Sequence, residues 1–175
     1  ALARIESGPA GPTVGAFFDL DGTLVKGFTA NAFFFDQVRE GTIGLRDAAR
    51  TLVAAVDGTK LGGSATRAGE LAFAALAGHQ EDALAQLGER LFLHDIAGSI
   101  RPEARTLVRA HQRRGHTVVV SSAATAYQVA PVARDLGIEH LVCTRLEVVD
   151  GAFTGKVIGR MLWGPEKGKG VRAFA

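Results

Sequence analysis

The chain has 175 residues, a single cysteine and a formal net charge of +2 at pH 7. This length allows one domain with a modest insertion, the lone Cys143 excludes an intrachain disulfide, and the mixed charges exclude a strongly basic surface for nucleic acid. No apolar run reaches the roughly 18 residues of a membrane span, and the first residues lack the apolar core of a signal peptide, so we expect a soluble, cytoplasmic protein.

The first core element is predicted just after the N-terminus. Residues 1–13 contain two prolines and two glycines without periodicity, which predicts an irregular leader. Val14 to Phe18 form a short apolar run that ends abruptly in the polar sequence Asp-Leu-Asp-Gly-Thr, as a buried strand does when it meets a loop. The carboxyl ends of such strands are where open α/β sheets bind ligands.

Two further regions follow with different patterns. Residues 29–97 read as helix-length segments broken by glycines, which predicts a helical insertion of about four helices, here called the cap. Residues 98–175 then alternate helix and strand. The predicted elements lie at 101–114, 116–120, 125–136 and 140–144, and a hairpin is predicted at 146–158. This alternation predicts an α/β fold with a parallel sheet, whose core is formed by residues 14–28 and 98–175.

The segment FFDLDGTL carries the strongest chemical signal. Two carboxylates two residues apart at a strand end suit two roles, with Asp19 as nucleophile and Asp21 as acid and base. Gly22 permits a sharp turn, and Thr23 has a hydroxyl that can hold the loop by a hydrogen bond. Gly22 and Thr23 are also predicted as phosphate-binding residues. The alternative interpretation is an ordinary Asp-Gly turn after a strand.

Two later segments offer groups that bind a phosphoryl oxygen. A serine hydroxyl and backbone N–H groups at the end of strand 116–120 suit a phosphate oxygen, and Ser121 or Ser122, with Ala123, stands there. A lysine can offset the negative charge of the phosphoryl group and of the attacking carboxylate, and the candidates are Lys167 and Lys169. The alternatives are a helix-capping serine and solvent-exposed lysines.

Together these motifs resemble the haloacid dehalogenase superfamily, whose D-x-D-G-T signature matches Asp19 to Thr23 and whose phosphatases form an aspartyl-phosphate. The downstream VAPVA is similar to the subclass with a helical cap and favours Ser122, and a G-x-x-K turn after a hairpin favours Lys167. The resemblance implies a Rossmann-like sheet with an inserted all-helical cap and a small phosphorylated substrate. It also implies Mg²⁺, held by Asp19 and the main-chain carbonyl of Asp21.

The family's fourth motif, an acidic pair that completes the Mg²⁺ shell, is not found, because Asp135 and Asp150 fall in a helix end and a hairpin turn. The sequence also predicts about three strands, where a doubly wound sheet has about five or six. We therefore expect the sheet to be incomplete at the C-terminus. We expect these 175 residues alone to bind Mg²⁺ weakly and to show no appreciable phosphatase activity.

Phosphoserine phosphatases share this plan, but they place a glutamate that grips the substrate where this sequence has Phe28, and the stretch matching their cap arginine, 70–78, is apolar. We expect poor hydrolysis of phosphoserine and a preference for less polar esters of the lysophospholipid or glycerol-phosphate type. The cap aromatics either line such an apolar pocket or, as we favour, form cap core; they are Phe28, Phe33, Phe34, Phe35 and Phe73.

The motif set looks closer to the phosphatase-like part of actinobacterial bifunctional proteins that carry a 1-acylglycerol-3-phosphate acyltransferase. That resemblance implies a fused acyltransferase domain and peripheral membrane association through it. The alternative function is a non-catalytic or regulatory module of such an enzyme, because a fold does not fix a function.

Overall fold

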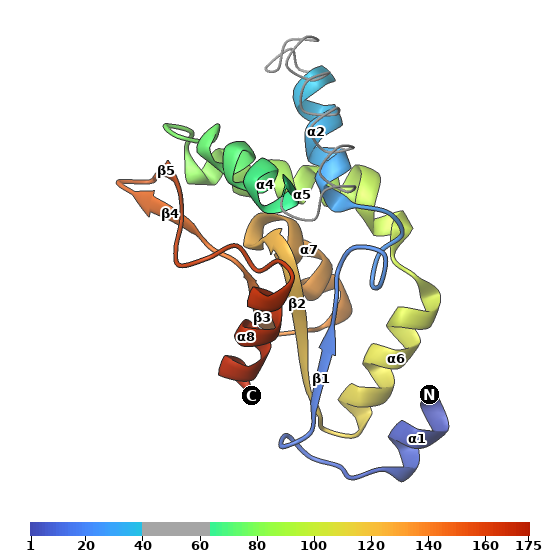
Figure 1. The fold of residues 1–175 in the computed structure, drawn as a ribbon. Coiled ribbons are helices and arrows are strands. Elements are labelled where there is room, and N and C mark those ends of the chain that lie inside the picture. The colour runs from blue at the N-terminus through green and yellow to red at the C-terminus, as the bar shows by residue number, and fades with distance from the viewer. Residues whose placement is uncertain (40–63) are drawn as a thin grey trace.

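The computed structural model describes residues 1–39 and 64–175. Its centre is a parallel three-stranded sheet in the order β1-β2-β3, with helices on both sides (Figure 1). The strands are β1 (Gly15–Phe18), β2 (Thr117–Thr125) and β3 (His140–Thr144). The predicted α/β fold with a parallel sheet is confirmed.

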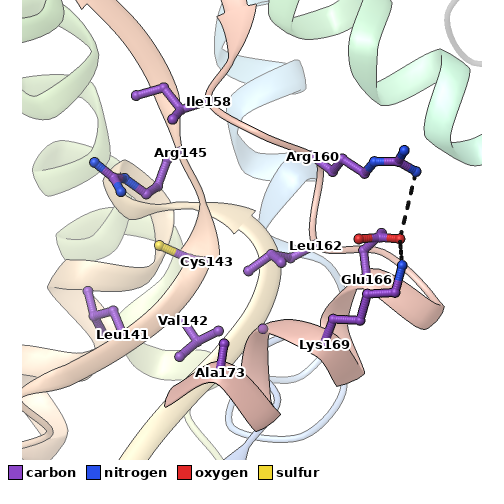
Figure 2. A pocket seen from close by; sticks show the side chains of 11 residues that line it. Leu141, Val142, Cys143, Arg145, Ile158, Arg160, Leu162, Glu166, Lys169 and Ala173 are labelled. Atoms are coloured by element: carbon purple, nitrogen blue, oxygen red, sulfur yellow. Dashed lines mark hydrogen bonds and ion pairs between the residues drawn. The ribbon is translucent and has the colours of Figure 1, made fainter.

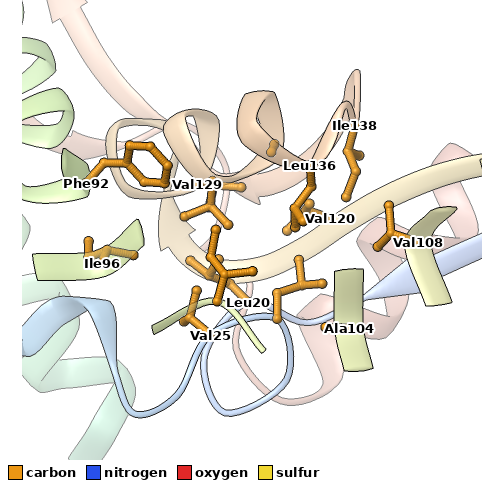
Figure 3. Packing of buried hydrophobic residues seen from close by; sticks show 14 of the residues in the cluster. Leu20, Val25, Phe92, Ile96, Ala104, Val108, Val120, Val129, Leu136 and Ile138 are labelled. Atoms are coloured by element: carbon orange, nitrogen blue, oxygen red, sulfur yellow. The ribbon is translucent and has the colours of Figure 1, made fainter. Parts of the chain in front are cut away.

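The main core lies between the sheet and the helices α6 (Pro102–Arg113) and α7 (Ala126–Leu136). Side chains alternate along β2, and Val118 and Val120 belong to one apolar cluster with Val108 of α6 and Val129 of α7 (Figure 3). Val108, Val120 and Val129 are fully buried. This cluster packs α6 and α7 against the sheet.

The opposite face of the sheet is covered by α8 (Pro165–Phe174), which follows the antiparallel hairpin of β4 (Leu146–Val149) and β5 (Ala152–Val157). The ring of Phe174 meets that of Phe17 on β1 edge to face, with centroids 6.0 Å apart. The hairpin turn has positive φ at Asp150 (51°) and Gly151 (77°), the geometry of a type I′ turn. The predicted hairpin is therefore confirmed.

The described part of the predicted cap consists of the helices α2 (Thr29–Arg39), α4 (Ser64–Ala74) and α5 (Glu81–Leu91). A π-helical turn, η1 (Phe92–Ile96), and a 3₁₀ turn, η2 (Ala97–Ser99), lead back to the core. The predicted number of about four cap helices depends partly on residues 40–63, which lie outside the described residues. Within the described ranges, no helix is both long and apolar enough to cross a membrane.

Cap helix α5 packs directly on core helix α7. Tyr127 donates a hydrogen bond of 2.8 Å from its hydroxyl to Glu81, and Arg134 pairs with Glu89 at 2.5 Å. Between these two contacts, a Cβ built on Gly88 would overlap the backbone carbonyl oxygen of Tyr127. The absence of a side chain at Gly88 therefore lets the two helices approach this closely.

Two predictions about the fold need correction. The leader is not irregular throughout, because Leu2–Ser7 form helix α1, which packs on α6. Its residues, rich in Ala, Leu, Arg and Glu, favour a helix despite the prolines and glycines that follow. The second strand continues past its predicted end at Val120, since Ser121 and Ser122 still pair with β3.

Candidate active site

The polar loop after β1 contains both predicted catalytic carboxylates. Leu20, between them, is fully buried in the core, while Asp19 and Asp21 both line a cavity of about 360 Å³. Gly22 has a φ of 72°, which favours glycine, and its N–H bonds the carbonyl of Gly27 at 3.0 Å. Local sequence therefore folds this loop so that two carboxylates reach one cavity.

Three segments that are distant in sequence meet around this cavity. Because β1 and β2 are parallel and Phe18 pairs with Val120, the carboxyl end of β1 lies beside β2 just before Ser122. The cavity is lined by residues from both strand ends and from the start of α8, namely Asp19, Asp21, Phe28, Ser122, Ala123, Leu162, Trp163, Gly164 and Lys167. Five of the predicted site residues are thus brought together.

Lys167 forms an ion pair with Asp19. Its Nζ lies 2.7 Å from Asp19 Oδ1, and the two side chains are 28% and 44% exposed. The same oxygen accepts a 2.8 Å hydrogen bond from the N–H of Leu20. Both contacts are to Oδ1, so they fix the orientation of the Asp19 carboxylate.

Lys169, the alternative lysine, lies elsewhere. It pairs with Glu166 at 2.6 Å and lines a second cavity, of about 530 Å³, between β3 and α8 (Figure 2). Arg160 also approaches Glu166, at 3.8 Å. The geometry therefore places Lys167, and not Lys169, beside the Asp19 carboxylate.

Asp21 is partly buried. Burial raises its pKa above the usual range for aspartate, and the nearby Asp19 carboxylate acts in the same direction. The N–H of Thr29 donates a 2.7 Å hydrogen bond to Asp21 Oδ1, which together with Lys167 opposes the shift. A carboxyl group with a raised pKa suits proton donation to a leaving group.

The two serines of β2, Ser121 and Ser122, differ in whether they line the cavity. Ser122 lines the cavity, and its Oγ accepts a 3.1 Å hydrogen bond from the N–H of Ala124. Ser121 is also buried, but it is not among the residues that line this cavity. Of the two serines, Ser122, with Ala123 next to it, is therefore the one that lines the cavity.

Gly22 and Thr23, which we predicted as phosphate-binding residues, are not among the cavity-lining residues. The N–H of Thr23 bonds the carbonyl of Leu20 at 3.3 Å, so in this structure the pair shapes the loop. Among the cap aromatics, Phe28 lines the cavity and Phe33 packs against the core cluster.

Sequence reasoning missed a buried hydroxyl that joins two sides of the cavity. Thr144, at the end of β3, donates a 2.7 Å hydrogen bond to the carbonyl of Ala123 and accepts one of 3.1 Å from the N–H of Leu162. Its side chain is 1% exposed. The only signal in the sequence is a hydroxyl residue at a strand end, which is too common to single out.

The site contains the type of ligand atom, oxygen, that Mg²⁺ binds. The carboxylate of Asp19 and the main-chain carbonyl of Asp21 supply hard oxygen atoms, which Mg²⁺ prefers. In the part of the chain that the structure describes, no group of three or more His, Cys, Asp or Glu side chains is placed to hold a metal. The two aspartates would therefore supply only part of an octahedral shell.

Comparison with known proteins gives a consistent picture. Residues 16–175 match the sequence family described as haloacid dehalogenase-like hydrolase. Over 173 residues the chain is 34% identical to phosphoserine phosphatase SerB1 of Mycobacterium tuberculosis, covering 95% of this chain and 56% of that protein. The chain thus spans about half the length of the curated relatives it matches.

Solved structures agree on the fold. A protein of unknown function from Bordetella pertussis superposes with a TM-score of 0.80 at 27% identity, covering 92% of this chain and 73% of that one. A substrate-bound phosphoserine phosphatase superposes with a TM-score of 0.63 at 21% identity, covering 93% and 70%. At that identity the second likeness supports the fold alone.

Proposed function

We propose that this chain, which belongs to the haloacid dehalogenase-like hydrolase family, hydrolyses phosphate monoesters at the cavity lined by Asp19 and Asp21. The observation that carries the proposal is the contact of 2.7 Å between Lys167 and Asp19 in the cavity that Asp21, with a pKa raised by burial, also lines. A paired nucleophile and a carboxyl group of raised pKa in one cavity are the two groups that a two-step displacement needs.

In the first step, an oxygen of Asp19 attacks phosphorus, the bond from phosphorus to the leaving oxygen breaks, and Asp21 gives that oxygen its proton. Lys167 and the N–H of Leu20 both hold Oδ1 of Asp19, so we assign Oδ2 as the attacking atom. In the second step, Asp21 takes a proton from water, which attacks the same phosphorus and restores the Asp19 carboxylate with release of inorganic phosphate.

The remaining polar groups of the cavity stabilise charge on the transferred group. Lys167 offsets the charge of the phosphoryl oxygens and of Asp19, and the hydroxyl of Ser122 with the N–H of Ala123 binds an equatorial oxygen. Mg²⁺, when bound by Asp19 and the main-chain carbonyl of Asp21, supplies further positive charge to the phosphoryl group.

Hydrolysis by the complete protein, before and after Asp19→Asn, tests the mechanism. We expect release of phosphate from generic monoesters to fall to background in the variant, while the melting temperature stays close to that of the parent. Beryllofluoride with Mg²⁺, which mimics an aspartyl-phosphate, should raise the melting temperature of the parent but not of the variant. Unchanged hydrolysis in Asp19→Asn would contradict the proposal.

The finer expectations from the sequence belong to the same proposal. The family and its phosphatase members support a phosphorylated small molecule as substrate. A less polar ester, a fused acyltransferase domain, peripheral membrane association and the alternative of a regulatory module stay predictions. Failure of both the hydrolysis and the beryllofluoride test would favour the regulatory module.

A further inference from the structure

Exposed aromatic and apolar residues are among those that line the catalytic cavity. Phe28 is 64% exposed and Trp163 is 49% exposed, and both line the cavity that contains Asp19 and Lys167. Leu162 lines it as well. Large aromatic side chains left in water at a concave site are typical of ligand contacts, because covering them with an apolar ligand is favourable.

Both aromatic residues are held in place by hydrogen bonds next to catalytic groups. Thr29, directly after Phe28, donates its N–H to Asp21 Oδ1 at 2.7 Å. The backbone of Trp163 bonds Met161 at 2.8 Å and Glu166 at 3.2 Å, in the turn that opens α8 and leads to Lys167. The backbone at both residues is therefore tied to the groups that we assign to phosphoryl transfer.

The charges of the cavity are all used by the proposed reaction. Among the lining residues that the structure describes, only Asp19, Asp21 and Lys167 are charged. A leaving group with an ammonium and a carboxylate would find no further charged partner there, and burying those charges unpaired is costly. An uncharged ring would instead gain contact with the aromatic side chains.

We propose that Phe28 and Trp163 select phosphate monoesters whose alcohol carries an aromatic or similarly flat, apolar group. This inference rests on the proposed phosphatase function and names its substrate class. A cavity of about 360 Å³ lies in the size range of small-molecule sites and suits a phosphoryl group with one ring system. Aromatic faces also attract cations, so a quaternary ammonium ester is the competing occupant that the experiment must exclude.

The kinetic experiment compares esters of similar alkyl alcohols, so that leaving-group reactivity stays nearly constant. The complete protein is assayed with 2-phenylethyl phosphate, propyl phosphate, phosphoserine and phosphocholine. We expect 2-phenylethyl phosphate to give the highest kcat/KM. The preference for 2-phenylethyl over propyl phosphate should fall about tenfold in Trp163→Ala, mainly through KM, and should be largely kept in Trp163→Phe.

Matched controls separate the possible results. Leu93→Ala removes an apolar side chain that is 71% exposed and is not among the cavity-lining residues, so the preference should not change. Phosphoserine or phosphocholine ranking first would overturn the inference while leaving the phosphatase function standing. An equal loss on all esters in Trp163→Ala would overturn it too.

Binding gives a readout that needs no turnover. Trp163 lines this cavity, so the part of the emission change that Trp163→Phe removes reports on ligand binding there. We expect benzylphosphonate to change the emission saturably and to bind more tightly than 2-amino-3-phosphonopropionate, an analogue of phosphoserine. Tighter binding of 2-amino-3-phosphonopropionate would overturn the inference. Tighter binding of benzylphosphonate by a complete protein that hydrolyses none of the esters would count against the proposed reaction alone.

Discussion

Lys167 and Asp19 lie near opposite ends of the sequence, yet their side chains form an ion pair of 2.7 Å. Asp19 follows β1, and Lys167 lies in the first turn of α8, whose Phe174 packs on Phe17 of the same strand. The packing of α8 on the sheet therefore determines the distance between the Asp19 carboxylate and Lys167.

Replacing Lys167 by methionine should lower kcat/KM by about 10² to 10³, because a positioned positive charge is lost from the transferred group. The matched control is Lys169→Met. Lys169 pairs with Glu166 at the surface, and its side chain is 62% exposed, so its loss should change kcat/KM less than about twofold. Equal effects of the two substitutions in steady-state kinetics would contradict the role given to Lys167.

Asp21 should determine the alkaline limb of the pH–rate profile. Burial raises its pKa, so it keeps its proton to higher pH than an exposed aspartate, and activity should fall as that proton is lost. Asp21→Asn should reduce kcat by about 10² to 10⁴ and remove that limb from the residual activity. A variant that retains the same limb would show that another group titrates.

The same substitution should stabilise the folded protein at neutral pH. A carboxyl group whose pKa is raised by folding contributes stability below its unfolded pKa, about 4, and loses it as the pH rises through the folded value. Asparagine avoids this loss and can still accept the N–H of Thr29 through its amide oxygen. In urea unfolding at pH 7, the free energy of unfolding of Asp21→Asn should be larger than that of the parent. The difference between the two should become smaller as the pH is lowered toward 4.

The control for that measurement is Asp135→Asn, which removes an ion pair of 2.5 Å with Arg105 that is about one-third exposed. Its stability at pH 7 should fall slightly, by about 1 kcal/mol or less. If Asp21→Asn lowered the free energy of unfolding at pH 7 as Asp135→Asn does, burial of the ionised Asp21 would carry no cost.

Local patterns predicted the parts of the structure that local interactions determine. The strand His140–Thr144 was predicted with its observed bounds, and the turn at Asp150-Gly151 follows from the positive φ that these residues tolerate. The motif after β1 pointed to Asp19 and Asp21 because a strand end and a short acidic loop are adjacent in sequence.

Features that depend on tertiary contacts were missed. β2 runs on to Thr125 because β3 continues to pair with it, and a pattern within one segment contains no information about that pairing. Thr144 was missed because its partners, Ala123 and Leu162, come from two other segments. The exposure of Trp163 at the cavity likewise became visible only with the fold.

Gly88→Ala should separate α5 from α7 and destabilise the protein. Because the added Cβ would overlap the carbonyl oxygen of Tyr127, the helices must shift, at a cost of about 1 to 3 kcal/mol. Gly98→Ala is the control, since a Cβ there meets nothing within 4 Å, and its stability should stay within about 0.5 kcal/mol. Urea unfolding measures the stability of both variants. If Gly88→Ala were as stable as Gly98→Ala, the two helices could move apart at little cost.

Thr144→Val should weaken both stability and catalysis, although the side chain keeps its shape. The hydroxyl is buried, and its loss leaves the carbonyl of Ala123 and the N–H of Leu162 without this partner, which costs about 1 to 3 kcal/mol. Because Ala123 and Leu162 both line the cavity, their displacement should also lower kcat for a generic monoester.

Two further variants distinguish positioning from a general loss of stability. Thr144→Ser restores the hydroxyl and should recover kcat even where it recovers stability only in part, since it lacks the buried methyl group. Thr106→Val removes a hydroxyl that bonds the carbonyl of Pro102 at 2.9 Å on the exposed side of α6, and it should change neither quantity appreciably. Urea unfolding and kcat measured on the same variants separate these two roles. If Thr144→Val lost stability but kept its kcat, Thr144 would be a core residue with no part in holding the cavity.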